Sequence, residues 1–183
     1  MQVAIIGAGP LGRWLALAAA RTGFAVLMED VMPANLHHAE EFLRLQLGPS
    51  ALPMVKFAAS IEEAVREADL AIDCVPDELE SKLEIFCLLD RMAPPRTILM
   101  TPTTRLSIAD LASCTYRADK CVALVLDVRE LNGNPIKAGA PWENGMRILL
   151  RTPPQASPET VALAREFWTR VGFDPSFEAD HTK

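Results

Sequence analysis

The sequence has little positive charge and gathers none of it into a cluster. Lysine and arginine number 18 against 24 aspartates and glutamates, which gives a formal charge of −6. A nucleic-acid-binding surface needs a basic patch, so we do not expect nucleic acid as a partner. No apolar run is long enough to cross a bilayer, and the N-terminus has the pattern of a strand rather than of a signal peptide. We therefore expect no membrane contact and a cytoplasmic location.

Cysteine and histidine are also scarce. The chain has four cysteines: Cys74, Cys87, Cys114 and Cys121. They show no C-x-x-C spacing and lie mostly in apolar segments, which favours buried reduced thiols over disulfides or zinc ligands. His37 and His38 are adjacent and would diverge on a helix, so the sequence predicts no metal site.

What the sequence does contain is enough apolar residues for a core, since half of its 183 residues are hydrophobic. This length suits one domain, residues 1–183. Its N-terminal part reads as a strand (2–7), a glycine turn, an alanine-rich helix (13–21), a second strand (24–28) and the acids Glu29 and Asp30. That order is the dinucleotide-binding fingerprint in its required context.

Each part of the fingerprint has a physical task. Gly7 allows the tight turn, Gly9 lets the backbone approach a pyrophosphate, and Gly12 lets the helix pack close to the sheet. Asp30 follows Gly12 by 18 positions, where a carboxylate should accept from the adenosine ribose and repel a 2′-phosphate. We therefore expect NAD rather than NADP. The expected cofactor-binding residues here are Gly7, Gly9, Pro10, Leu11, Gly12 and Asp30.

Helices and strands alternate along the rest of the chain. Helices are expected at 34–47, 78–91, 107–112 and 157–171, with a further helix that contains Ile61, Ala64 and Val65. Strands are expected at 52–57, 69–75, 97–101, 121–126, 146–151 and 176–178. We expect Leu36, Phe42 and Leu45 to face the sheet, and Ser60 to cap a helix with Glu63. Residues 130–145 have the composition of an ordered loop. The sequence thus predicts an α/β fold, a Rossmann-type doubly wound, mostly parallel sheet with helices on both faces.

From about Gln2 to Asp180 the chain resembles the N-terminal, NAD-binding domain of the L-3-hydroxyacyl-CoA dehydrogenases. The matching stretches are IIGAGPLG (5–12), DLAIDCVPD (69–77), LDRMAP (89–94), TILMT (97–101), LSI (106–108) and SPETV (157–161). The resemblance implies NAD as cofactor, an oxidoreductase role in fatty acid metabolism and a ribose contact from Asp30. It also places Asp77 and Lys82 where the family has a glutamate and a lysine near the cofactor.

The catalytic half of the resemblance is poor. The family's catalytic histidine falls on Val125, and the acid that orients it falls within 146–150, where this chain has none. In the family's N-T-S-S turn, Pro102 replaces the asparagine, while Thr104 keeps a hydroxyl and is the one catalytic candidate. The segment from Asp30 to Phe57 is shorter than the corresponding segment of the family, in which a helical hairpin helps bind coenzyme A. The resemblance also ends near Asp180, where the family continues into a helical domain. His181, near the end, is expected to fray rather than to act as a base.

Three readings stay open. The first is an NAD(H)-binding protein with weak or no family activity. The second is an oxidoreductase for a hydroxyacyl-type substrate, completed by oligomerisation or by a partner chain. The third is a non-enzymatic interaction module, which the intact glycines and Asp30 argue against.

Several individual side chains also have two possible roles. Thr104 either polarises a carbonyl or caps the next helix, and Arg105 either meets an anion or is a solvated loop residue. Trp14 either packs or restricts the site. Lys82 either reaches the cofactor or pairs with Glu78 or with the Glu84 side of its own helix.

An apolar surface is expected where the family's helical domain would dock. It should lie near 124–128 and in the loop 131–142, which ends in Trp142. Exposed apolar patches of this kind usually mark an interface, so we expect a homodimer or a partner chain with Trp142 near the contact.

Overall fold

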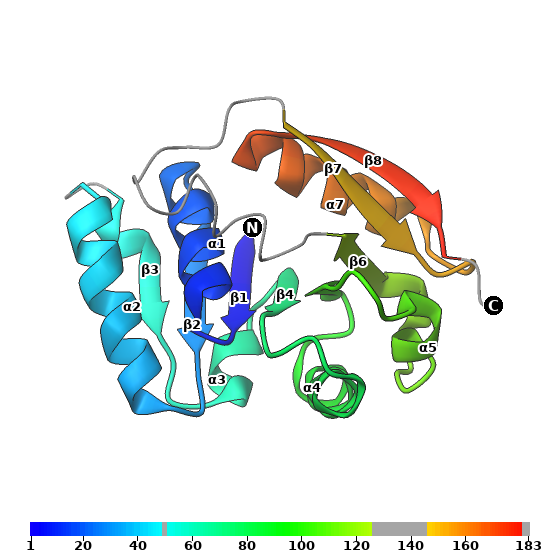
Figure 1. Ribbon diagram of the computed structural model, residues 1–183, viewed down its shortest axis with the longest axis horizontal. Coiled ribbons are helices and arrows are strands. Elements are labelled where there is room, and N and C mark those ends of the chain that lie inside the picture. The colour runs from blue at the N-terminus through cyan, green and yellow to red at the C-terminus, as the bar shows by residue number, and fades with distance from the viewer. Residues whose placement is uncertain (49–50, 126–145, 181–183) are drawn as a thin grey trace.

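The computed structural model describes residues 1–48, 51–125 and 146–180, and its strands form one sheet of eight (Figure 1). The strand order is β3-β2-β1-β4-β5-β6-β7-β8. All neighbours are parallel except β6 and β7, which run antiparallel. The strands are β1 (Gln2–Ile6), β2 (Ala25–Glu29), β3 (Val55–Phe57), β4 (Leu70–Asp73), β5 (Ile98–Pro102), β6 (Cys121–Val125), β7 (Met146–Thr152) and β8 (Phe173–Ala179).

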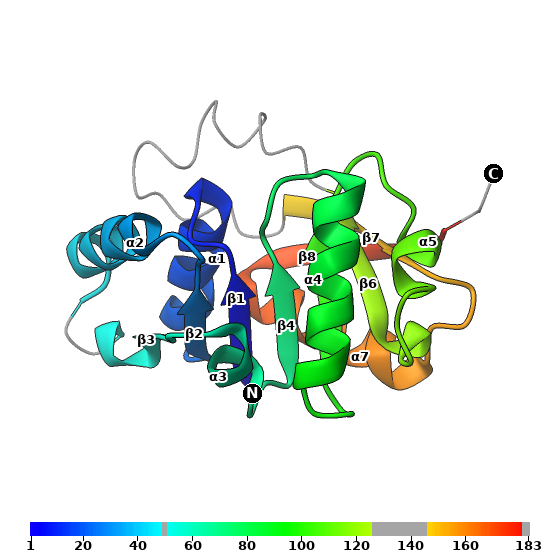
Figure 2. The same cartoon turned by 90° about the horizontal axis from the view of Figure 1, so that it is seen from below.

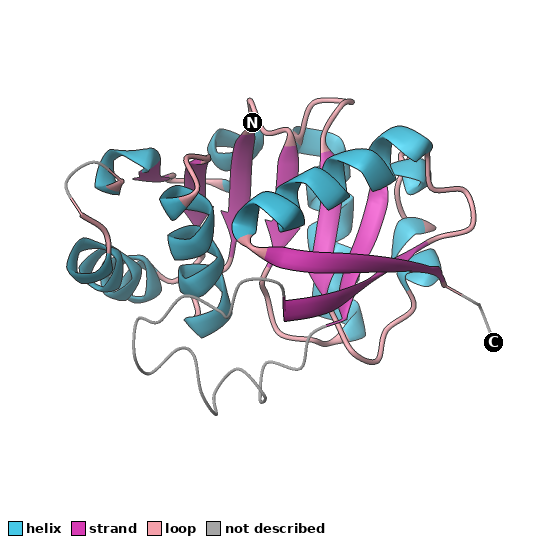
Figure 3. Ribbon diagram, turned by 90° about the horizontal axis from the view of Figure 1, so that it is seen from above, coloured by secondary structure: helices cyan, strands magenta, loops and turns pink. Residues whose placement is uncertain are grey.

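Helices cover both faces of the sheet, as the sequence predicts. Helices α3, α4 and α5 lie on one face (Figure 2), and α1, α2 and α7 lie on the other (Figure 3). The helices are α1 (Pro10–Arg21), α2 (Pro33–Gln46), α3 (Ile61–Val65), α4 (Leu79–Met92), α5 (Ile108–Ala112) and α7 (Pro158–Val171), with 3₁₀ turns η1 (Leu52–Met54) and η2 (Ala118–Lys120). The α/β doubly wound architecture is therefore confirmed.

The central strands are apolar on both faces because each face meets a helical layer. In β1, Val3 and Ile5 belong to the core under α1 and α7, whereas Ala4 and Ile6 belong to the core under α3, α4 and α5. This alternation follows from the two-residue side-chain period of a strand.

Local capping agrees with the sequence. The Ser60 hydroxyl accepts from the Glu63 amide at 3.2 Å, and the Glu63 carboxylate accepts from the Ala59 amide at 2.8 Å. The Ser107 and Ser157 hydroxyls likewise accept from the Asp110 and Thr160 amides at the starts of α5 and α7. These caps satisfy amides that would otherwise lack partners at the helix starts.

Several expected details are wrong. Leu45 does not face the sheet but is 83% exposed, because α2 buries only Ala39 and Leu43. The segment 52–57 is split between η1 and a strand of three residues, since Pro53 lacks the amide that an interior strand position needs. The last strand covers Phe173–Ala179 rather than 176–178, because it pairs with β7 along its whole length.

The four cysteines are free thiols, as expected: Cys121 is buried and the other three are half-buried. Burial raises the pKa of Cys121 to about 12, so this thiol stays protonated at neutral pH. None of the helices in the described ranges is long and apolar enough to cross a membrane. Trp142, His181 and most of the expected apolar surface lie outside the described residues, while Leu124 is part of the core and not of a surface.

Candidate functional site

A pocket of about 570 Å³ lies at the carboxyl ends of the central parallel strands. This is where open α/β sheets bind their ligands. It is lined by Ile6, Gly7, Gly9, Pro10, Leu11, Glu29, Asp30, Val31, Met32, Asn35, Ile61, Cys74, Val75, Pro76, Asp77, Ile85 and Pro102. The pocket thus brings together most of the residues that the sequence suggests for a cofactor. Gly12, Lys82 and Thr104 are not among its lining residues.

The glycine turn needs its glycines for different reasons. Gly7 has a φ of +107°, and a Cβ on it would lie 2.9 Å from the Cys74 carbonyl carbon. A Cβ on Gly12 would lie 1.9 Å from the Gly7 carbonyl oxygen, so this glycine permits α1 to pack on its own turn. A Cβ on Gly9 would meet nothing within 4 Å. Gly9 therefore faces open space on the pocket side.

Helix α1 begins at this pocket without a side-chain cap. The N-cap residue is Gly9, which has no side chain to accept from the first amides of the helix. Pro10 occupies the first helical turn, where its missing amide costs little. Leu11 is buried beside it. The uncapped amides and the positive end of the helix dipole give this wall of the pocket an affinity for anions.

Asp30 fastens the turn to the end of β2. Its carboxylate accepts from the Ala8 amide at 2.7 Å and from the Met32 amide at 2.8 Å. The Asn35 side-chain amide donates to both carboxylate oxygens at 3.1 Å. Asn35 is a pocket residue that the sequence reading missed, and its position in the first turn of α2 is the signal that could have found it.

Asp77 joins the loops that follow β4 and β5. Its Oδ2 accepts from the Thr104 amide at 3.4 Å, and its carbonyl accepts from the Arg105 guanidinium at 3.1 Å. Its Oδ1 is buried and has no hydrogen-bond partner in the described part of the chain. A buried carboxylate oxygen without a donor is rare and costly, so this atom is a ready acceptor for a ligand.

Lys82 lies beneath the pocket, 1% exposed. Its ammonium group donates to the Thr101 hydroxyl at 2.8 Å, to Asp73 at 3.1 Å and to the Val75 carbonyl at 3.4 Å. The expected pairing with its own helix is wrong, because the buried Asp73 attracts the ammonium more strongly than solvated glutamates do. Burial raises the pKa of Asp73, and the Lys82 charge opposes that rise most. A cofactor contact from Lys82 stays a prediction.

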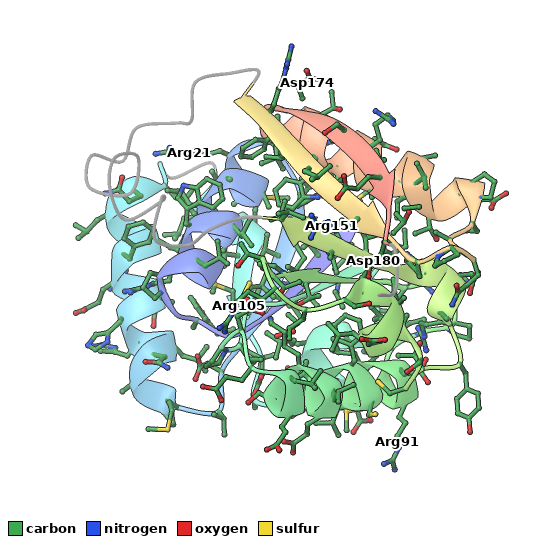
Figure 4. All side chains as sticks on the ribbon, turned by 45° about the vertical axis from the view of Figure 1, so that its right-hand side comes forward. Arg21, Arg91, Arg105, Arg151, Asp174 and Asp180 are labelled. Atoms are coloured by element: carbon green, nitrogen blue, oxygen red, sulfur yellow. The ribbon has the colours of Figure 1, made fainter. Side chains whose placement is uncertain are left out.

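Thr104 is exposed in the loop after β5 and does not cap the next helix. The neighbouring Thr103 hydroxyl accepts instead from the Arg105 and Leu106 amides, and Ser107 caps α5. Arg105 is exposed on the same loop (Figure 4). Its guanidinium donates to the Asp77 carbonyl, so this arginine bridges the two loops.

Two further residues have packing roles. Trp14 is buried, and its ring packs edge-on against Phe173 with centroids 6.3 Å apart. It is not a lining residue of the pocket and so does not restrict it. Val125 ends β6, half-buried, opposite Leu149 of β7. Two hydrocarbon side chains therefore occupy the register position where the resemblance would place a base.

Curated relatives of the chain include dehydrogenases. A probable 3-hydroxybutyryl-CoA dehydrogenase of Bacillus subtilis is 31% identical over 136 residues, which are 67% of this chain and 47% of that protein. A 5-formyl-3-hydroxy-2-methylpyridine 4-carboxylate 5-dehydrogenase of Mesorhizobium japonicum is 28% identical over 95% of this chain and 56% of its own length. The chain thus spans about half the length of the curated relatives it matches.

Solved structures share the fold. A diketoreductase superposes with a TM-score of 0.82 and 27% identity over 100% of this chain and 65% of that one. The (S)-3-hydroxybutyryl-CoA dehydrogenase of Ralstonia eutropha has a TM-score of 0.83 and 22% identity, covering 98% of this chain and 64% of that one. The family model for the NAD binding domain of 3-hydroxyacyl-CoA dehydrogenase matches residues 2–124, and the chain belongs to that family.

Proposed function

We propose that the chain binds NAD(H) in this pocket, in preference to NADP(H), and that it has little 3-hydroxyacyl-CoA dehydrogenase activity by itself. Membership of an NAD-binding family supports the cofactor. The anion-binding start of α1 suits the pyrophosphate, and Asp30 at the end of β2 suits the adenosine ribose. The residues proposed to hold the cofactor are Gly7, Gly9, Pro10, Leu11, Gly12, Asp30, Asp77 and Lys82.

The order of the strands sets the direction of the cofactor. With the pyrophosphate beside β1 and the adenosine ribose at β2, the nicotinamide half extends toward β4 and β5. Asp77 and Pro102 line that end of the pocket. NAD supplies the hydride-accepting ring when bound, whereas this chain's residues only hold and orient it.

The observation that carries the proposal is the unpartnered Oδ1 of Asp77. A ligand hydroxyl that donates to this buried oxygen removes a cost of about 1–3 kcal/mol, and a ribose offers such hydroxyls. The oxygen sits on the nicotinamide side, so the donor would be the second ribose of the dinucleotide.

The test is a calorimetric titration of the purified chain with NADH. We expect Asp77→Ala to weaken binding by ~1–3 kcal/mol. A matched control is Asp174→Ala, which removes an exposed aspartate on β8, away from the pocket (Figure 4). Absence of NADH binding, or equal affinity of the Asp77 and Asp174 variants, would contradict the proposal.

Dehydrogenase activity is the second candidate, and the names of the relatives favour it. In that case the missing base would come from an oligomer or a partner chain, and Thr104 would contact the substrate oxygen. Turnover assays with short and long 3-hydroxyacyl-CoA substrates separate the two candidates. Robust turnover by the unmodified chain would favour the enzyme.

The partner proposal concerns a homodimer or a second chain at the segment that includes Trp142. Light scattering at high protein concentration tests the homodimer, and capture of a companion chain from extract tests the alternative. A monomer that captures nothing would contradict both.

A further inference from the structure

Glu29 is the one residue of the pocket lining whose charge the proposed cofactor contacts leave unused. It ends β2, is 9% exposed and lines the pocket. Its carboxylate receives no hydrogen bond from residues 1–48, 51–125 or 146–180. Burial, and next the charge of Asp30, raise the pKa of Glu29, as expected for an acid with no donor.

The register of the sheet allows Glu29 to be compared with a second acid, Asp73. Ile6 of β1 is paired with Glu29 on one side and with Asp73 on the other, so the two acids point to the same face. Asp73 is satisfied by Lys82, Thr101 and the Val75 amide. Glu29 has no such set, and its carboxylate oxygens, unlike Oδ1 of Asp77, are not sealed from solvent, so they can accept from a ligand in the pocket.

We propose that Glu29 selects the base of the bound cofactor by accepting a hydrogen bond from the exocyclic amino group of adenine. This rests on the proposed function, because it assumes a dinucleotide in the pocket. It adds a specificity-determining residue to that site.

The placement of the base follows from the rest of the site. Since Asp30 holds the adenosine ribose, the base continues past the end of β2, away from Asp77 and β5. Besides Glu29, Asp30 and Asn35, the lining there is apolar: Ile61 of α3, Val75, and Val31 and Met32, which are 86% and 56% exposed. A flat purine covers such side chains, and its amino group is the N–H donor that a carboxylate needs.

The first measurement uses the wild-type chain and two reduced cofactors, NADH and reduced nicotinamide hypoxanthine dinucleotide. The second has a keto oxygen in place of the adenine amino group, and that oxygen would face the Glu29 carboxylate as one acceptor against another. We expect it to bind about ten-fold or more weakly than NADH. Equal affinity for both would overturn the proposal.

The second measurement repeats the titrations with both cofactors on the Glu29→Gln variant. A glutamine amide accepts from the adenine amino group and also donates to the keto oxygen, so we expect the preference to fall below about three-fold. The matched control is Glu62→Gln, which removes the same charge from an exposed site beside Ile61 and should keep the wild-type preference.

The outcomes separate the two proposals. NADH binding with an unchanged base preference in Glu29→Gln overturns the role of Glu29 alone. No NADH binding by the wild type overturns the proposed function and this inference with it. The wild-type comparison decides the matter even if the variant does not fold.

Discussion

Substitutions at Gly9 and Gly12 should affect ligand binding and folding separately, because an added Cβ has different surroundings at the two positions. A Cβ on Gly9 has nothing within 4 Å, whereas a Cβ on Gly12 would lie 1.9 Å from the Gly7 carbonyl oxygen. Gly9 also has an ordinary φ of −66°. We therefore expect Gly9→Ala to fold and to lose NADH, and Gly12→Ala to lose stability.

The magnitudes follow from these contacts. For Gly9→Ala, a less flexible unfolded chain offsets a poorer N-cap, so the free energy of unfolding should change by less than about 1 kcal/mol. For Gly12→Ala, the clash involves backbone on both sides and cannot be relieved by a side-chain rotation. Overpacking of this kind costs about 3 kcal/mol or more, and the Tm should fall by roughly 6–12 °C.

The assay is thermal unfolding of both variants together with an NADH titration. The added methyl of Gly9→Ala points into the space proposed for the pyrophosphate, so we expect NADH to bind at least about ten-fold more weakly. Gly9→Ala with wild-type affinity would show that no ligand approaches this residue. Gly12→Ala with a wild-type Tm would refute the packing argument.

Three further predictions concern other parts of the site. Asp30→Ala should weaken NADH binding by ~1.5–3 kcal/mol and reduce the preference over NADPH, and calorimetry with unchanged affinities would contradict this. Lys82→Met should lower the free energy of unfolding by about 3–5 kcal/mol in chemical denaturation, because it leaves Asp73 buried without its ion-pair partner. Arg44→Met, which breaks an exposed ion pair, should lower it by at most about 1 kcal/mol. Equal losses of stability in the two variants would refute the reasoning. Val125→His should not create 3-hydroxyacyl-CoA oxidation in a turnover assay, since no acid in β7 can orient the new base; clear activity would overturn this.

The order of elements could be predicted from the sequence because it rests on local signals. The strand–turn–helix–strand unit follows from three local features: glycines at fixed spacing, an apolar run on each side of them and an acid after the second strand. The fold class followed because strands and helices alternate. The capping of α3 by Ser60 was equally local, since its partner Glu63 is three residues away.

Contacts between distant residues could not be predicted in the same way. The Lys82 ammonium meets Asp73 and Thr101 only because β4, α4 and β5 pack together, and nothing in the spacing of these residues distinguishes that pairing from one along the helix. Likewise, the exposure of Leu45 depends on where α2 lies against α1 and not on its own periodicity. The isolation of Glu29 became visible only with the register of β1 and β2.

The most direct test of the central claim is a calorimetric titration of the unmodified chain with NADH and NADPH under the same conditions. NADH should bind, and NADPH should bind more weakly, because a 2′-phosphate on the ribose that we propose lies at Asp30 would meet a second negative charge. Equal affinity for the two cofactors, or no binding of either, would contradict the account.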